Sequence, residues 1–167
     1  LPLIIHTRDA ETDTAAMLRW MSLITSDIQK LAQGEPVVAD AQPQLALGPA
    51  RFTAAVGFGP SLFRKLGLES KRPESLDATL KFAIDNLQPE FSDGDVLIQV
   101  ACDDPLILAH ASRVLIRDSL SFATVRYSQR GFTNAQGVVA KGVHQRNLMG
   151  QVDGTDNPKL GSDRSEE

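Results

Sequence analysis

The residues of this sequence best suited to chemistry lie in one short segment near its end, Gly150–Pro158. Asp153 stands between Gly150 and Gly154, which can adopt positive φ angles, and Pro158 stiffens the far end. We expect a sharply turning loop that presents a carboxylate, and a carboxylate held over a ligand can accept and return a proton. The alternative is a surface turn around Asp-Gly, a common turn pair, and spacing alone favours that alternative.

The residues around this loop resemble a known family motif. The run Arg146–Pro158 is similar to the GxxDG segment of the dye-decolourising peroxidases, whose usual form is close to N-L-x-G-F-x-D-G-T-x-N-P. Two further stretches, Val56–Phe63 and Asp93–Val100, resemble the same family and occur in the family's order. The resemblance covers most of the chain from about Ala54 onward.

The resemblance implies a peroxidase that uses haem b, reduces hydrogen peroxide and oxidises dyes or phenolic donors. It implies that Asp153 is the catalytic residue, a distal acid/base that accepts a proton from hydrogen peroxide and returns it to the leaving oxygen. A positioned group of this kind typically contributes about a hundred- to ten-thousandfold in rate. The cofactor-binding residues implied are Asp153, Gly154, Thr155 and Asp156, which would border the porphyrin.

The three histidines, His6, His110 and His144, do not reveal an axial ligand for haem iron. The resemblance implies that the proximal histidine and the distal arginine belong to a second domain, so the expected partner is the remaining C-terminal part of the same protein. His110 falls on or beside an apolar helical face, where packing is favoured over ligation. His144 is interpreted as a loop histidine that is neither ligand nor acid.

Two other functions stay open at this point. A deferrochelatase-like role in haem handling would use the same fold and the same loop, so the sequence does not separate it from peroxidase activity. A ferredoxin-like binding domain without haem would use the Asp153 segment only as a turn. This last hypothesis predicts no Soret absorption and no effect of Asp153→Asn on activity.

Composition narrows the class of protein. With 167 residues, 42% of them hydrophobic and 23% charged, the chain can form a folded domain with a substantial core. A net charge of −4 and scattered basic residues argue against nucleic-acid binding. Cys102 is the only cysteine and is expected to be a buried, inert thiol, and no apolar run is long enough for a membrane span. Export to the periplasm or the cell exterior is expected from the resemblance, with a cytoplasmic location as the alternative and homo-oligomer formation left open.

Periodicity and capping residues predict alternating strands and helices. Asp9–Asp13 supplies residues suited to a helix N-terminus, and Gly34 is expected to end this helix. The apolar stripe predicted for it consists of Ala16, Met17, Trp20, Leu23, Ile24, Ile28 and Leu31. Asp104 and Pro105 are expected to cap and open a second helix, whose apolar face includes Leu106, Ile107, His110, Ala111, Val114 and Leu115. The predicted strands are Leu1–His6, Arg51–Phe58, Asp95–Cys102 and Phe122–Arg130. The strand Asp95–Cys102 is nearly all apolar, so we expect it in the centre of a sheet and covered on both faces.

This order predicts an α+β fold, a ferredoxin-like sandwich in which helices cover one face of an antiparallel sheet. The resemblance implies that it is the first of two such domains. We expect residues 1–142 to form this N-terminal domain, with an irregular insertion at 67–92. Residues 143–167 are expected to form the GxxDG loop, facing haem, and the start of a linker. The first residue already lies inside a predicted strand, so we expect the sequence to be one piece of a longer chain.

Overall fold

The computed structural model describes residues 2–7, 13–46, 48–76, 82–134 and 137–154, with the backbone alone described for 2–7. The chain divides into two compact units, Leu1–Gly131 and Phe132–Glu167, each of which makes most of its contacts within itself. The predicted domain boundary at residue 142 stays a prediction. The helices and strands are β1 (Pro2–Thr7), α1 (Thr14–Gln33), β2 (Thr53–Phe58), α2 (Pro60–Lys65), β3 (Val96–Ala101), α3 (Pro105–Ser119) and β4 (Ala123–Ser128).

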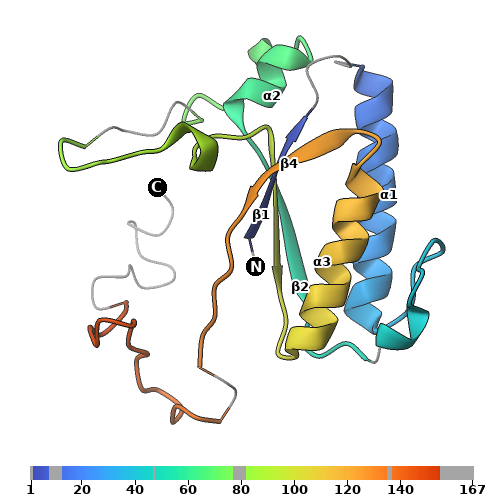
Figure 1. Cartoon of the computed structure of the whole chain (residues 1–167). Coiled ribbons are helices and arrows are strands. Elements are labelled where there is room, and N and C mark those ends of the chain that lie inside the picture. Colours follow the sequence, from blue (N-terminus) through green and yellow to red (C-terminus); the bar gives the residue numbers. More distant parts are fainter. Residues whose placement is uncertain (1, 8–12, 47, 77–81, 135–136, 155–167) are drawn as a thin grey trace. The chain divides into compact units, whose positions relative to one another are not determined.

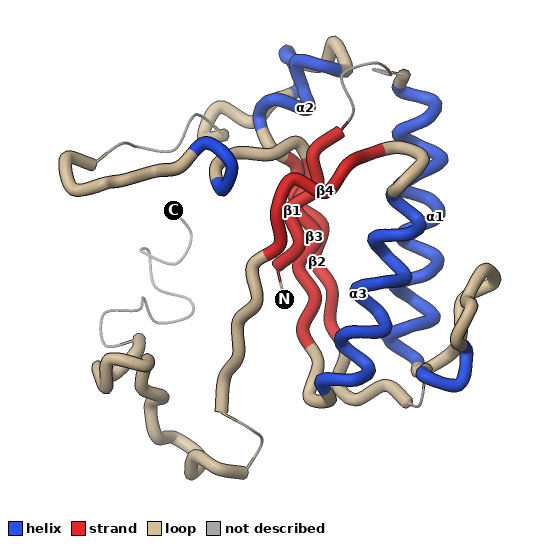
Figure 2. Tube along the Cα trace, viewed as in Figure 1, coloured by secondary structure: helices blue, strands red, loops and turns tan. Residues whose placement is uncertain are grey.

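The first unit is a four-stranded antiparallel sheet with the strand order β2-β3-β1-β4. Helices α1 and α3 contact each other and lie side by side against one face of this sheet (Figures 1 and 2). The order of elements is strand, helix, strand, irregular segment, strand, helix, strand, with the short α2 after β2. This arrangement confirms the predicted ferredoxin-like α+β fold.

Local capping signals set the ends of α1. The Asp13 side chain accepts a hydrogen bond from Ala15 N at 2.9 Å, which satisfies one free amide of the first turn. At the other end, Gly34 adopts φ +73° and its amide bonds to Leu31 O. A Cβ at Gly34 would also lie 2.4 Å from the backbone of Gly48, so both the conformation and the close approach require glycine.

The buried stripe of α1 differs in two positions from the predicted one. Leu23 was expected in the core but is 39% exposed, whereas Asp27 is buried. Trp20, Ile24, Asp27 and Leu31 follow one another at three- and four-residue steps, so the centre of the stripe passes through Asp27. Aspartate is rarely buried, which is why the apolar pattern alone placed the stripe too far towards Leu23.

Helix α3 begins as predicted, because Asp104 caps the backbone amides of Leu106 and Ile107. Leu106 itself was expected on the apolar face and is 50% exposed. It lies in the first turn, about 100° around the helix from Ile107, and so falls at the edge of the buried stripe. The core between helices and sheet includes Trp20, Ile24, Leu31, Phe52, Leu62, Val96, Ile98, Val100, Ala111, Val114 and Leu115.

Strand β3 lies inside the sheet, between β2 and β1, as expected for the most apolar strand. The expectation that it is covered on both faces is wrong for this chain. Val96, Ile98 and Val100 are buried, but Gln99 and Ala101 on the alternate face are exposed. The physical reason is that α1 and α3 both cover the same face of the sheet.

The two stretches that resembled the family besides the Asp153 loop meet at the end of β2. Gly59 N bonds to Asp95 O at 2.8 Å, and a Cβ on Gly59 would lie 2.1 Å from Gly94 O. The fully buried Asp95 carboxylate accepts hydrogen bonds from the Ser61 hydroxyl and, at 2.8 Å, from Lys65 Nζ. This corner therefore anchors α2 to the sheet and has a structural role.

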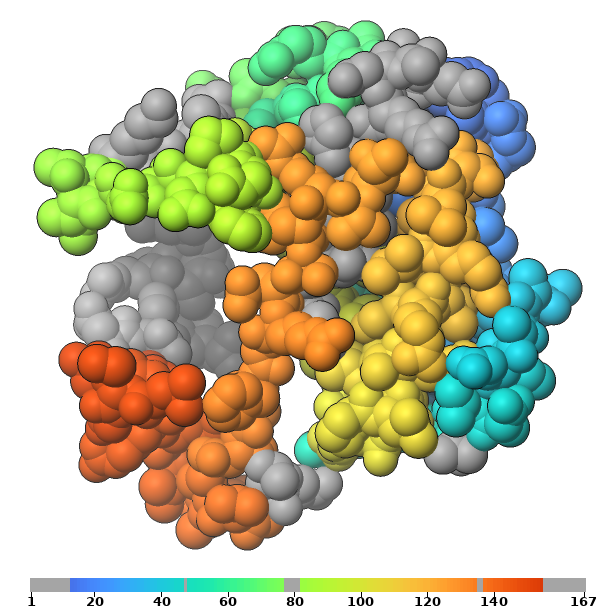
Figure 3. Space-filling model, viewed as in Figure 1, coloured from blue at the N-terminus to red at the C-terminus, as the bar shows by residue number. Residues whose placement is uncertain are grey.

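The segment between α2 and β3 is irregular, as predicted, apart from short 3₁₀ turns at Glu69–Lys71 and Pro89–Phe91. The second turn packs on β4 (Figure 3). Arg126 Nη2 donates to Pro89 O at 2.6 Å, and the rings of Phe91 and Tyr127 meet in a T-shaped arrangement with their centroids 5.8 Å apart. Cys102 was expected to be buried and is half-buried, with its thiol 3.3 Å from Ala50 O. No helix in the described ranges is long and apolar enough to cross a membrane.

Candidate functional site

The candidate loop is a short hairpin, residues 145–153, in the second unit (red in Figure 1). Arg146 and Val152 form an antiparallel bridge. On one side of this bridge Asp153 N donates to Gln145 O at 2.9 Å, and on the other side Asn147 N donates to Gln151 O at 2.9 Å. The residue with the candidate carboxylate is thus held by backbone hydrogen bonds at the base of a hairpin.

Asn147 closes the tip of this hairpin. Its carbonyl accepts a hydrogen bond from Gly150 N at 2.9 Å, and its side-chain Oδ1 accepts from both Met149 N and Gln151 N at 3.0 Å. Its Nδ2 lies 3.2 Å from Gln151 Oε1. The sequence analysis assigned Asn147 no role, although asparagine three residues before a glycine is a recognisable signal of a β-turn.

The two glycines of the loop adopt the positive φ angles expected of them, +80° at Gly150 and +74° at Gly154. At Gly150 no atom of the described residues, its two chain neighbours aside, lies within 4 Å of where a Cβ would stand, so the backbone conformation and not crowding requires glycine. The Arg146 guanidinium supports this corner by donating from Nη1 to Gly150 O at 2.7 Å.

Asp153 is exposed at the base of the hairpin. In the described part of the chain no group hydrogen-bonds to its carboxylate, whereas the carboxylates of Asp95 and Asp40 are buried and bonded. Asp153 and Gly154 also form a turn, as the alternative of a surface turn around Asp-Gly predicted. The loop therefore contains this turn and also exposes the Asp153 carboxylate. Thr155 and Asp156, the other predicted cofactor-binding residues, lie outside the described residues.

The two histidines whose side chains are described, His110 and His144, belong to different units. His110 is buried, and its Nε2 is 2.9 Å from Asp40 Oδ2, which confirms that it packs in the first unit. His144 is an exposed residue of the second unit, and the side chain of His6 lies outside the described part. Among the described residues no group of three or more potential ligands could hold a metal ion.

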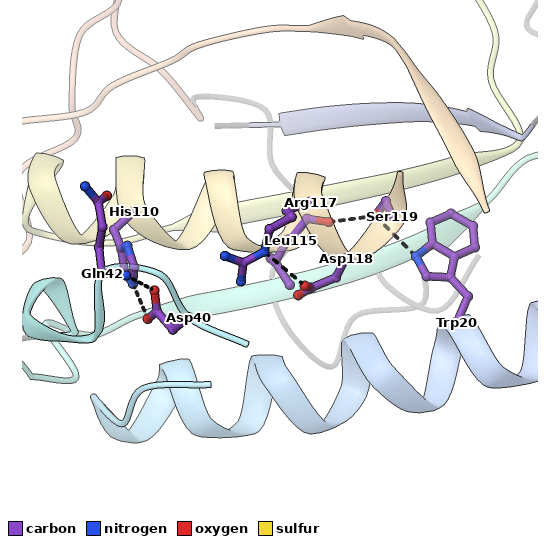
Figure 4. Close-up of polar contacts among 8 residues, drawn as sticks. All are labelled: Trp20, Asp40, Gln42, His110, Leu115, Arg117, Asp118 and Ser119. Carbon is purple, nitrogen blue, oxygen red and sulfur yellow. Dashed lines mark hydrogen bonds and ion pairs between the residues drawn. The ribbon is translucent and has the colours of Figure 1, made fainter. Parts of the chain in front are cut away.

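A buried polar layer between α1 and α3 was missed by the sequence analysis (Figure 4). On the side of α3 it includes Asp118, whose side chain is only 6% exposed, and Ser119, whose hydroxyl accepts the Trp20 indole N–H at 3.2 Å. The pKa of Asp118 is raised to about 6, first by burial and then by the hydrogen bond with Asp27 and the charge of Asp27, against the opposing charge of Arg117. The sequence signal that could have revealed this buried polar layer is Asp27, the acidic residue within the apolar stripe of α1.

An exposed ion pair at the opposite end of the first unit shows the reverse effect. Arg51 Nε and Nη2 donate to the two carboxylate oxygens of Asp103 at 2.6 and 2.8 Å. These hydrogen bonds lower the pKa of Asp103. Neither this pair nor the buried layer between the helices includes a residue of the Asp153 hairpin.

Comparison with known proteins gives a consistent result. Residues 4–133 match the family model described as "Dyp-type peroxidase, N-terminal". The chain is 33% identical over 150 residues to a protein named "Dye-decolorizing peroxidase" from Thermobifida fusca, covering 89% of this chain. It is 31% identical over 160 residues to a protein named "Deferrochelatase" from Yersinia pseudotuberculosis, again covering 89% of this chain.

Among solved structures, a DyP-type peroxidase from Cellulomonas bogoriensis is 42% identical and superposes with a TM-score of 0.89 over 95% of this chain. This chain spans 44% of that structure's chain. It spans 34% of the Thermobifida protein and 37% of the Yersinia protein. The similarity thus extends over nearly all of this chain and less than half of each relative.

Proposed function

The chain belongs to the Dyp-type peroxidase family, as its N-terminal region, and on this premise we propose that it supplies the proton-transfer residue of a haem peroxidase. The proposed reaction reduces hydrogen peroxide and oxidises a dye or phenolic donor. The proposed cofactor is haem b, and the proposed acid/base is Asp153. The C-terminal part of the same protein is the proposed partner that completes the site.

One observation carries this proposal. The Asp153 carboxylate is exposed on a hairpin that is held by its own hydrogen bonds, and no group in the described residues uses it. Elsewhere in the described chain Asp95, Asp40 and Asp104 each serve a structural contact. A carboxylate with a held backbone and free oxygens is suited to bind and move a proton.

The residues present fit one side of a haem site. Asp153 offers a proton acceptor, and Gly154 offers backbone without a Cβ at the adjacent position. With Thr155 and Asp156, these residues would hold the porphyrin on that side. His110 does not fit the role of axial ligand, because its Nε2 is already bonded to Asp40 inside the first unit. Haem, when bound, would supply the two electrons for cleavage of the O–O bond and would take up the oxygen atom that does not leave as water.

The chain's own contribution is a proton transfer. The Asp153 carboxylate accepts a proton from one oxygen of hydrogen peroxide and returns it to the other oxygen, which leaves as water when the O–O bond breaks. Protonation makes that oxygen a far better leaving group. The hydrogen-bonded hairpin keeps the carboxylate in place between the two transfers, so that the same group acts first as base and then as acid.

A deferrochelatase-like function is the second candidate, because a protein with that name matches the same share of this chain as the Thermobifida relative. Both functions would use the same hairpin. They differ in the product, since removal of iron from haem leaves the porphyrin ring intact, whereas peroxidase turnover oxidises the donor. Analysis of porphyrin and donor products after incubation with haem and peroxide separates them.

The experiment that tests the proposal begins with a pyridine haemochrome spectrum of the purified protein. A b-type spectrum is expected. Stopped-flow mixing with hydrogen peroxide should then show that Asp153→Asn retains haem and reacts about a hundred- to ten-thousandfold more slowly. An unchanged rate would remove Asp153 from the mechanism. Absence of haem would favour the haem-free binding domain.

The other predictions from the resemblance are tested separately. Export stays a prediction, which cell fractionation of the producing organism would check. Homo-oligomer formation stays open in the same way, and light scattering on the purified protein would measure the mass.

A further inference from the structure

We propose that Asn147 is a positioning residue for Asp153, an inference that rests on the proposed function of Asp153. No hydrogen bond joins Asn147 to Asp153 among the described residues, and the two lie six positions apart in the sequence. Asn147 stands at the closed end of the hairpin and Asp153 at its base. The link between them is the hydrogen-bond ladder of the hairpin.

The described part of the second unit lacks a buried core. None of its described residues is buried, and the hairpin tip carries Leu148 and Met149, each 85% exposed. Apolar packing among the described residues of this unit therefore contributes little to the shape of the hairpin. A loop without a core loses its fixed conformation unless local hydrogen bonds offset the entropy cost of about 1 to 2 kcal/mol per ordered residue.

Asn147 takes part in most of the hydrogen bonds at the tip of the hairpin. Its side-chain Oδ1 accepts from two backbone amides, Met149 N and Gln151 N, each at 3.0 Å, and its Nδ2 lies 3.2 Å from Gln151 Oε1. Its backbone adds bonds to Gly150 and Gln151. The Asn147 side chain thus takes the place of a backbone acceptor, as in an Asx-turn, and links the two sides of the hairpin through Gln151.

Pairs of bonded residues connect the turn at Asn147 to Asp153. Gln151 is bonded to Asn147, Val152 pairs with Arg146, and Asp153 N bonds to Gln145 O. These are successive residue pairs of the hairpin. The pairing set by the turn at Asn147 therefore determines that Asp153 pairs with Gln145. No described residue bonds to the Asp153 carboxylate itself. The position of its Cα and Cβ atoms is therefore set by the backbone hydrogen bonds of the hairpin. Loss of the Asn147 side chain should leave Asp153 present but poorly placed.

A set of three variants isolates this role in the haem-containing protein. Asn147→Ala removes all side-chain bonds of the turn. Asn147→Asp keeps an Oδ1 acceptor for both amides, and Gln151 can turn its amide to face the new carboxylate. Asn134→Ala is the matched control, because Asn134 is an exposed asparagine of the same unit for which no side-chain hydrogen bond is found in the described residues.

The expected result is a split between these variants. Asn147→Ala should lower the second-order rate constant for hydrogen peroxide, per bound haem, by roughly ten- to a hundredfold, because misplacement of a reacting group by about 1 Å has an effect of that size. Asn147→Asp should restore most of the rate, and Asn134→Ala should match the parent protein. In an Asp153→Asn background, Asn147→Ala should cause almost no further loss.

Amide hydrogen exchange gives a readout that does not depend on turnover. The amides of Met149 and Gln151 should exchange faster in Asn147→Ala than in the parent and should stay protected in Asn147→Asp and Asn134→Ala. Unchanged protection in Asn147→Ala would overturn the inference. So would a loss of haem in this variant, because Asn147 would then act in binding haem and not in placing Asp153.

The failure of this inference can be distinguished from the failure of the proposed function. If Asp153→Asn reacts slowly and Asn147→Ala reacts at the parent rate, the positioning role is wrong and the proposed function stands. Fully additive losses in the double variant would also refute positioning. If Asp153→Asn reacts normally, the proposed function is wrong and the role of Asn147 ends with it.

Discussion

The two compact units differ in what holds them together. The unit 1–131 has a core between a sheet and two helices, and the buried side chains of Trp20 and His110 are bonded to partners distant in the sequence, Ser119 and Asp40. The hairpin 145–153 has no buried residue and is held by local backbone and Asn147 hydrogen bonds. The difference teaches that the buried, bonded carboxylates of Asp95 and Asp40 and the carboxylate proposed for proton transfer, Asp153, belong to different units.

The largest expected effect on stability is at the buried Asp95 in the first unit. Asp95→Ala should lower the free energy of unfolding by about 3 kcal/mol or more, because it leaves the Lys65 ammonium without a carboxylate it is bonded to at 2.8 Å. Chemical denaturation measures the change. Asp103→Ala, which breaks the exposed pair with Arg51, is the control and should have a much smaller effect. Equal losses would contradict the comparison.

The next effect contrasts one glycine from each unit. Gly59→Ala should cost about 2 to 3 kcal/mol, because its Cβ would lie 2.1 Å from the Gly94 carbonyl oxygen and the backbone must move. Gly150→Ala meets open space, and its φ of +80° should cost only about 1 kcal/mol, confined to the hairpin. Denaturation curves compare the two. Greater damage from Gly150→Ala would mean that the hairpin supports the fold.

A smaller effect, dependent on pH, is expected at Asp118. Its pKa in the folded protein is raised to about 6, above the ordinary value of 3.8, so the folded state binds the proton more tightly than the unfolded state. The stability that this proton contributes is fully present below pH 4 and is lost as the pH rises through 6. Above pH 7 the charged carboxylate should cost about 1 to 3 kcal/mol.

Asp118→Asn tests this directly, since it removes the charge and keeps the shape. The variant should be more stable than the parent at pH 8, with little difference at pH 4, as measured by thermal unfolding across this range. Asp103→Asn is the matched control, because the pKa of Asp103 is lowered and not raised. A parent protein whose stability rises between pH 5 and 7 relative to Asp118→Asn would refute the buried-carboxyl interpretation.

The smallest effect on stability is expected at Asp153. Asp153→Asn should change the free energy of unfolding by less than about 0.5 kcal/mol, because the side chain is exposed and no described residue bonds to its carboxylate. The same substitution is expected to have the largest effect on the reaction with peroxide. Denaturation and stopped-flow measurements on one sample test both halves, and a marked loss of stability would remove the contrast between the two units.

Much of the first unit could be predicted because its signals are local. The cap at Asp13, the αL residue Gly34 and the pair Asp104-Pro105 each act through neighbouring backbone atoms, so they mark helix ends wherever the helix later packs. The positive φ angles of Gly150 and Gly154 were predictable for the same reason. The burial of Asp27 was not, because the apolar pattern treats every aspartate as a surface residue.

The sequence by itself determined the strands and helices, their ferredoxin-like order and the loop that displays Asp153, since these depend on periodicity, capping and turn residues close together in the chain. Only the tertiary structure decided which atoms meet across the fold. Gly59 is required by a carbonyl 35 residues later, at Gly94, and His110 is held by Asp40. Contacts between distant segments depend on how the helices and sheet pack, and no local pattern records that packing.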